Sequence, residues 1–455
     1  MQGAGRVFLL IVLSLGLPTG AGAADASRAP DLLTLAGAFR LAAAYDARIA
    51  AARAALRAGR EQRAQGRALL LPTLGFRADT TYNDLDVEFQ RPHPLLPSGT
   101  RSYNSNRYGV ELNQPLYDRA KLARYRQSQA LATQAEIGYA VALQELILRV
   151  SEAYFDALLA EDTLRHLEAE LAAVTALRDR VRRTFEAGVA AITDVREAEA
   201  RFDLVHARAI GARNTVRVRR EALRKLLGRS VSALAPLRAP VALVPPRPED
   251  PEHWADAAEQ SGFAAAIARE TVEVARQELA RREGGREPRL DLVANYADAS
   301  ENDSVFGIGV DTTAGSVGVQ VQMPLYAGGA LRSQVREAAA RYEQARHERD
   351  ETARQARLDA QEAYLGLENG IAQAQAYEQA VRSSETALGA AERGLAAGTR
   401  TALDVLNAQQ QLYGARRELA ASRYAAILAG LRLMALVGGL TETELLAVDA
   451  LLEAP

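Results

Sequence analysis

The chain has 455 residues, 55 basic and 57 acidic side chains with a formal net charge of −2, and no cysteine. The length would suit two or three ordinary domains, the charge balance without a basic block argues against a nucleic-acid partner, and the missing cysteine excludes disulfides, thiolate metal sites, a cysteine nucleophile and a lipid-bearing N-terminal cysteine. Aromatic residues make up only 5% of the chain, a composition that favours close-packed helices over a bulky globular core.

The first 23 residues have the pattern of a secretory signal peptide. Arg6 precedes an apolar run over residues 7–17, and Ala21-Gly-Ala23 fits a cleavage site with two small residues. The apolar run is too short to span a bilayer, since a spanning helix needs about 20 residues. We therefore predict a signal peptide over residues 1–23 and a mature chain that begins near Ala24.

No later segment offers the roughly 18 uncharged apolar residues that a spanning helix needs. The nearest, residues 425–440, is interrupted by Arg432 and has its apolar residues at helical spacing. This pattern predicts an amphipathic helix. Any entry of the exported chain into a membrane must therefore use strands.

The first half of the chain, residues 24–233, alternates between helical and strand patterns. An Ala- and Arg-rich segment predicts a helix over 31–66, and a period of two then predicts a β-hairpin over about 73–114. Helical patterns return as a long helix over 118–187 and a return helix over 194–227. The expected order is therefore helix, hairpin, long helix and return helix.

The predicted hairpin has one apolar and one polar face. Apolar side chains alternate with polar ones along both strands, at Leu74, Phe76, Ala78 and Tyr82 in the first and at Tyr108, Val110 and Leu112 in the second. Strands of about 10 residues with this alternation are typical of outer-membrane barrels.

The long helix sets the scale of the molecule. Residues 118–187 contain no proline, and as one helix they would be about 105 Å long. The opening and return helices together have a similar length. We expect these two shorter helices to stack end to end beside the long one, in a wall about 100 Å tall.

A Pro-rich linker over 234–251 leads into a second half, residues 252–437, with the same order of elements. The tail over 438–455, like the linker, is expected to be peripheral to the helical wall. The second half is predicted to contain a helix at 252–283, a hairpin at about 289–323, a long helix at 328–394 and a return helix at 404–437.

A constant offset of 210 residues relates the two halves. It pairs Gly188 with Gly398 and Asp194 with Asp404, and it holds without a gap over residues 152–228. We interpret the chain as a tandem duplication whose halves fold alike. Each glycine ends a long helix at a helix-turn-helix tip, and the four residues that begin at Thr401 have the spacing of a capping box, with Asp404 in place of the usual Glu.

Four strands cannot close a barrel, and an open strand edge in lipid leaves backbone groups unpaired. Closure therefore requires other copies of the chain. Eight strands from a dimer would be filled by their own side chains, whereas twelve from a trimer leave a lumen. Cyclic symmetry with two halves per chain would then place six similar units around one pore.

The tip sequences resemble the TolC family of outer-membrane channel proteins. The resemblance lies in residues 188–195, 397–406 and 412–420, and in the Pro-Leu-Tyr strand exits that begin at Pro115 and Pro324. It implies a mainly α fold with a small membrane β part: a homotrimeric channel-tunnel with a 12-stranded barrel in the outer-membrane lipid and a long helical barrel in the periplasm. Its lipid-anchored branch carries an N-terminal cysteine, which this chain lacks.

The resemblance also implies partners and a gate. Such ducts work with a periplasmic adaptor (membrane fusion) protein and an inner-membrane pump of the ABC or proton-driven class, in type I protein secretion or multidrug efflux. By motif position, the constriction falls on Thr193 and Asp194 in the first tip and on Arg400 and Asp404 in the second. The turn glycines are Gly188 and Gly398.

Two residues depart from the family pattern. Leu395 stands where a gate tyrosine is found, and Asn407 stands where a second ring aspartate is found, so a ring of three rather than six carboxylates is implied. Asp194 and Asp404 also have a purely structural interpretation, because aspartate in the first turn of a helix is commonly a cap. Arg400 is otherwise a solvated turn residue.

Catalysis has little support in the sequence. The histidines are widely spaced and match no metal-ligand pattern, and the glycine pairs lack the lysine of a phosphate loop. The five histidines are His93, His166, His206, His253 and His347. We predict no enzyme, cofactor or metal. The rival interpretation is a periplasmic coiled-coil adaptor or scaffold without a channel, and the cargo is open between polypeptide and drug.

Overall fold

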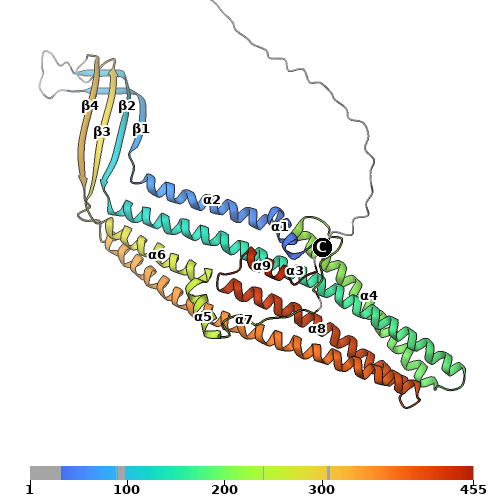
Figure 1. Ribbon diagram of the computed structural model, residues 1–455. Coiled ribbons are helices and arrows are strands. Elements are labelled where there is room, and N and C mark those ends of the chain that lie inside the picture. The colour runs from blue at the N-terminus through green and yellow to red at the C-terminus, as the bar shows by residue number, and fades with distance from the viewer. Residues whose placement is uncertain (1–31, 89, 91–97, 239, 305–307, 454–455) are drawn as a thin grey trace, which may run out of the picture.

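The computed structural model describes residues 32–88, 90, 98–238, 240–304 and 308–453. A four-stranded sheet stands at one end of a long bundle of helices, and the turns between paired long helices lie at the other end (Figure 1). The predicted signal peptide falls outside the described residues.

The sheet contains strands from both halves of the chain. Its order is β1-β2-β3-β4 with every neighbouring pair antiparallel, so the pairing of β2 with β3 joins the two halves. The register shifts between Pro115 and Tyr117, where β2 runs into the next helix. The strands are β1 (Thr73–Val87), β2 (Gly99–Tyr117), β3 (Arg289–Glu301) and β4 (Val310–Gln322).

One face of the sheet is apolar across all four strands. Phe76 pairs with Val110, Val110 pairs with Tyr296, and the neighbouring row ends on Val317. These side chains are exposed, by 72% at Phe76 and 77% at Val317. The alternating register places polar side chains such as Glu111 on the opposite face. The apolar side is therefore continuous and uncovered in the single chain.

Two helices run almost the whole length of the bundle. They are α3 (Arg119–Glu186), with 68 residues, and α7 (Ala330–Ala396), with 67 residues, so each is about 100 Å long. The return helices pack beside the parts of these two helices that lead to the tips: α4 (Ile192–Leu227) beside α3 and α8 (Ala402–Leu436) beside α7.

Each predicted opening helix is two helices in the structure. The first is α1 (Leu35–Tyr45) and α2 (Ala47–Ala68). Asp46 divides them because its backbone N–H ends α1 on the carbonyl oxygen of Ala42, while its carboxylate accepts hydrogen bonds from the backbone N–H groups of Arg48 and Ile49 and starts α2. The single helix predicted over 31–66 was therefore wrong.

In the second half the break falls at Gly262, between α5 (Pro251–Ser261) and α6 (Phe263–Gly284). A Cβ at this position would lie 2.4 Å from the carbonyl oxygen of Ala258 and 2.6 Å from that of Leu436. The end of α8 thus passes too close for any side chain at Gly262. With a ψ angle of 140°, Gly262 leaves the helical conformation, and its N–H ends α5 on the carbonyl oxygen of Ala258, so the single helix predicted over 252–283 was wrong.

The linker and the tail form one structure around the middle of the bundle, which we call the belt (residues 229–238, 240–250 and 438–453). Its tail contains α9 (Glu442–Asp449). Leu445 is 0% and Leu452 1% exposed within the main hydrophobic core, and Leu237 pairs with Leu452 in an antiparallel bridge. The prediction that the tail is peripheral was wrong, because its leucines complete the core.

Tyr154 fixes the belt to the long helix α3. Its ring is 0% exposed, and its hydroxyl lies 2.8 Å from the carbonyl oxygen of Leu33 and 3.0 Å from that of Ala235. Tyr154 therefore packs at the junction of α3, the start of the described chain and the belt.

Among the described residues, α8 is the one helix long and apolar enough to cross a membrane by length and composition. Packing covers part of its apolar surface: Leu431 and Leu433 are at most 3% exposed against the neighbouring helices. Arg432 on the same helix binds Glu152 of α3 at 2.7 Å.

Candidate functional site

The two helical tips have the same backbone geometry. Gly188 and Gly398 adopt φ angles of 78° and 71°, the left-handed region that favours glycine. In the first tip the N–H of Val189 donates to the carbonyl oxygen of Thr184 at 3.0 Å, and in the second that of Thr399 donates to Gly394 at 2.9 Å. Each pair lies 210 residues from the other, so the two turns are equivalent.

The second tip starts α8 with a complete capping box, as predicted. The Asp404 backbone N–H donates to the Thr401 hydroxyl at 3.2 Å, and the Thr401 backbone N–H donates to Asp404 Oδ2 at 2.9 Å. Arg400 Nη1 lies 3.7 Å from Asp404 Oδ1. The hydrogen bonds from Thr401 hold the pKa of Asp404 below its usual range, and the Arg400 charge lowers it further.

The first tip is built differently. Helix α4 begins after Ala191 without a side-chain cap, and Asp194 lies in its first turn, where a negative charge is favourable beside the free backbone N–H groups. In the described part of the chain, Asp194 makes no side-chain hydrogen bond or ion pair, and Thr193 is exposed. Of the four predicted gate residues, only Arg400 and Asp404 are brought together.

The structure shows a contact between the tips that the sequence did not reveal. Arg201 of α4 donates to the side-chain oxygen of Gln410, and its Nη2 lies 3.4 Å from Asn407 Oδ1 on α8. Asn407 is one of the two departures from the family pattern. It therefore links the two tips within one chain, and no spacing rule could have paired it with Arg201.

Leu395, the other departure, belongs to an apolar cluster at the tips. It packs against buried residues that include Val195 from the first tip and Val405 from the second. The two helical hairpins therefore share one core where the gate was predicted. An apolar side chain at position 395 fits that core.

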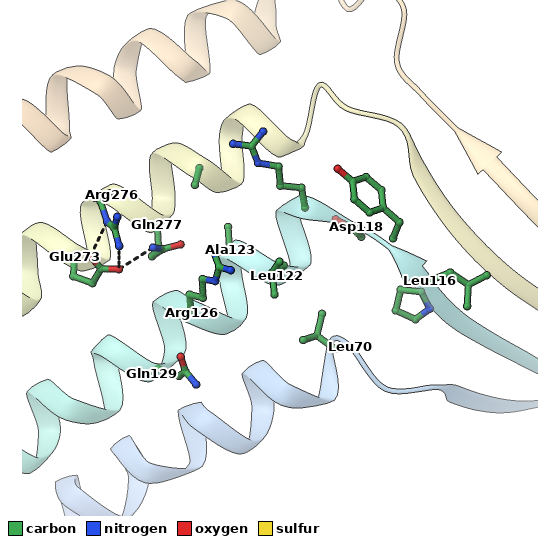
Figure 2. A pocket seen from close by; sticks show the side chains of 14 residues that line it. Leu70, Leu116, Asp118, Leu122, Ala123, Arg126, Gln129, Glu273, Arg276 and Gln277 are labelled. Atoms are coloured by element: carbon green, nitrogen blue, oxygen red, sulfur yellow. Dashed lines mark hydrogen bonds and ion pairs between the residues drawn. The ribbon is translucent and has the colours of Figure 1, made fainter.

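The predicted strand exits lie at the junction of sheet and helices. Pro115 and Arg126 line a cavity of about 890 Å³ between the end of α2, the start of α3 and α6, and Figure 2 shows Leu70, Leu122 and Arg126 around it. The side-chain amide of Gln114 donates to the carbonyl oxygen of Leu70 at 3.0 Å. Pro324 lines a smaller cavity at the start of α7.

No cluster of three or more His, Asp or Glu side chains suited to a metal ion occurs in the described part of the chain. His93 lies outside it. The geometry at the tips is one of caps, ion pairs and close packing.

A sequence profile of outer membrane efflux proteins matches residues 38–229 and 255–439. The chain belongs to this family. The outer membrane efflux protein family comprises outer-membrane channel proteins and not enzymes, which removes the scaffold alternative. The two matched segments correspond to the two halves of the chain.

Characterised members of the family resemble the chain over most of its length. It is 33% identical to the proteases secretion protein PrtF of Dickeya chrysanthemi, over 98% of this chain and 94% of that protein. It is 33% identical to outer membrane protein TolC of Vibrio cholerae serotype O1, over 84% and 86%. It is 32% identical to the alkaline protease secretion protein AprF of Pseudomonas aeruginosa, over 92% and 87%.

Solved structures establish the fold. The outer membrane protein VceC from Vibrio cholerae superposes with a TM-score of 0.75 at 21% identity, over 90% of this chain and 97% of that one. CusC superposes with a TM-score of 0.76 at 14% identity, over 93% and 99%. The protein therefore has the channel-tunnel fold and resides in the outer membrane, with its helical rod in the periplasm.

Proposed function

We propose that three copies of the chain form one conduit and that this conduit exports a polypeptide. The observation that carries the proposal is the sheet, whose exposed apolar face spans four strands while β1 and β4 are left as open edges. Open edges in lipid leave backbone groups unpaired, so neighbouring copies must pair with them. Twelve strands then enclose a lumen.

The helices offer a matching surface for neighbouring copies. Leu204, Ile210 and Val218 on α4 are each at least 55% exposed in the single chain. Contact with a second copy would cover these apolar side chains. TolC-like channels form trimers and act with adaptor and pump partners, and we extend both features to this chain.

The length of the rod decides where partners can bind. About 100 Å of helix extends from the sheet to the tips, so the tips lie deep in the periplasm. We assign to them the partners of TolC-like channels, a periplasmic adaptor and an inner-membrane pump of the ABC or proton-driven class. The outer-membrane lipid contacts the apolar face of the sheet. No nucleic acid takes part in this arrangement.

We place the gate at Thr193, Asp194, Arg400 and Asp404. The support is their position on the two equivalent turns at the free end of the rod. Asp404 can serve as cap and as ring residue, because Thr401 occupies Oδ2 while Oδ1 lies 3.7 Å from Arg400 Nη1 and has no nearer partner among the described residues. Asp194 and Thr193 are free to meet Arg400 of a neighbouring copy.

Asp404→Asn should abolish the block of the channel by multivalent cations. Asparagine retains an oxygen that can accept the Thr401 N–H, so the cap is kept while the three charges of the ring are lost. The measurement is single-channel conductance in planar bilayers with and without a trivalent cation. Unchanged block would remove Asp404 from the constriction, and Asp359→Asn, at a partly exposed position midway along α7, is the control.

The cargo is proposed to be a secreted polypeptide, because two relatives that match most of the chain are protease secretion proteins by name. A strain that lacks the protein should lose a secreted protein from its culture medium while its drug sensitivity changes little. The measurement compares secreted proteins and growth inhibition in the deletion and complemented strains. Full secretion with increased drug sensitivity would instead assign the duct to efflux.

A further inference from the structure

A cavity about two-thirds of the way from the sheet to the tips is lined by four arginines. It has a volume of about 320 Å³ and lies between α3, the belt and α8. His166 and Tyr424 complete its polar wall. The four arginines are Arg165 of α3, Arg238 of the belt, and Arg416 and Arg423 of α8.

The arginines have hydrogen-bond donors to spare. Arg238 gives its Nε hydrogen to the carbonyl oxygen of Leu452 at 2.6 Å, and it has no carboxylate partner in the described part of the chain. Each of the other three has one: Arg165 with Asp162 at 2.8 Å, Arg416 with Glu385 at 2.7 Å, and Arg423 with Glu378 at 3.6 Å. Since a guanidinium carries five N–H groups, one carboxylate leaves several unused.

Negative charge on the cavity wall is scarce. Asp162 is the one acidic residue among the described residues that line it, and its carboxylate already accepts the Tyr424 hydroxyl at 2.7 Å. The pKa of His166 is lowered, first by burial and also by the charges of Arg165, Arg416 and Arg417, against the opposing pull of Asp162. The cavity is therefore positive even with a neutral imidazole.

The duplication provides no second copy of this cavity. The positions 210 residues away from Asp162, Arg165 and His166 are Ala372, Gln375 and Ala376, and those that correspond to Arg416 and Tyr424 are His206 and Asn214. Only Arg423 has an arginine counterpart, Arg213. The cluster belongs to the contact between the two halves of one chain and would occur three times in a trimer.

The position of the cavity decides which anionic groups can reach it. Arg165 lies 46 residues along α3 from its start at Arg119, about 70 Å from the sheet, so lipid phosphates cannot reach it. Because the belt residue Arg238 forms part of the wall, and a belt inside the conduit would obstruct it, the cavity faces the periplasm. A periplasmic protein can reach it from outside.

We propose that this cavity binds carboxylate side chains from an acidic segment of a periplasmic partner, at one site per chain. The outward orientation rests on the proposed conduit, but the cavity itself forms within a single chain. Arginine forks match carboxylates in two parallel hydrogen bonds. The site would hold a partner against the side of the rod, about 30 Å above the tips.

The test is the binding of a fluorescent peptide with six consecutive glutamates to the purified protein, measured by anisotropy. Arg238→Gln and Arg416→Gln should each weaken binding about tenfold, the effect of losing one hydrogen bond to a charged group, and added salt should weaken it further. Arg213 corresponds to Arg423 in the first half and lies outside the cavity, so Arg213→Gln should leave the affinity for the peptide unchanged. A hexalysine peptide should not bind.

Equal affinity in the wild type and both cavity variants would overturn the proposal. Inorganic phosphate is the second probe: if it binds with the same dependence on Arg238 and Arg416 while the peptide does not, the site takes a small anion and the acidic partner is wrong. Channel conductance and trimer content are measured on the same samples. Their failure would count against the conduit, whereas the peptide result would still report on a cavity built within one chain.

Discussion

Arg417→Met should lower the free energy of unfolding by about 3–5 kcal/mol, because it leaves a buried carboxylate without its counter-charge. Glu170 of α3 is 0% exposed. Its Oε2 lies 2.9 Å from Arg417 Nη1 of α8, and its Oε1 has no hydrogen-bond partner among the described residues. The measurement is equilibrium denaturation of the detergent-solubilised protein.

Arg213→Met is the matched control. Arg213 pairs with Glu168 at the same distance, 2.9 Å, but both side chains are about half exposed, and such surface pairs contribute at most about 1 kcal/mol. The double variant Glu170→Met/Arg417→Met should recover most of the loss, since an apolar pair of similar volume often replaces a buried ion pair without cost. If Arg417→Met costs no more than Arg213→Met, the pair does not hold the two halves together.

Val110→Arg should prevent most of the protein from assembling in the outer membrane. Val110 lies on the central strand β2, between Phe76 and Tyr296 on the apolar face. An arginine facing lipid costs about 2–4 kcal/mol near the middle of the bilayer, and each copy in a trimer would bear that cost. The measurement is the amount of heat-modifiable oligomer in outer-membrane fractions.

Glu111→Arg tests the orientation of the sheet with the same new side chain one residue away. Glu111 pairs with Gly75 and Asn295 on the polar face, so an arginine there would face the lumen and assembly should be near that of the wild type. Equal loss for both variants would show that the apolar face of the sheet is not the lipid face.

The contacts of α8 explain how two similar halves act as one unit. Arg432 binds Glu152, the Tyr424 hydroxyl binds Asp162, and Arg417 binds Glu170, all between α8 and α3. Nearer the tip, Arg201 of α4 reaches Asn407 and Gln410. These polar contacts recur along the contact between α8 and the first half, beside apolar clusters to which both halves contribute.

Much of the architecture could be predicted from local patterns in the sequence. The period of two in residues such as Phe76 and Val110 predicts strands with one apolar face, because side chains alternate across a strand. The capping box at Thr401 and Asp404 was predicted and is present, since it depends on neighbours three residues apart. Glycines with left-handed φ mark the two tips for the same reason.

What only the tertiary structure decided depends on residues far apart in the chain. Position 262 has no room for a side chain because the end of α8 passes within contact of it, and Leu452 is buried because the belt brings it beside Leu237. The arginine cavity and the Arg201 contact arise in the same way, from helices that meet only in the folded chain. Periodicity reports which face of an element is apolar, but it carries no information on which distant element will cover that face.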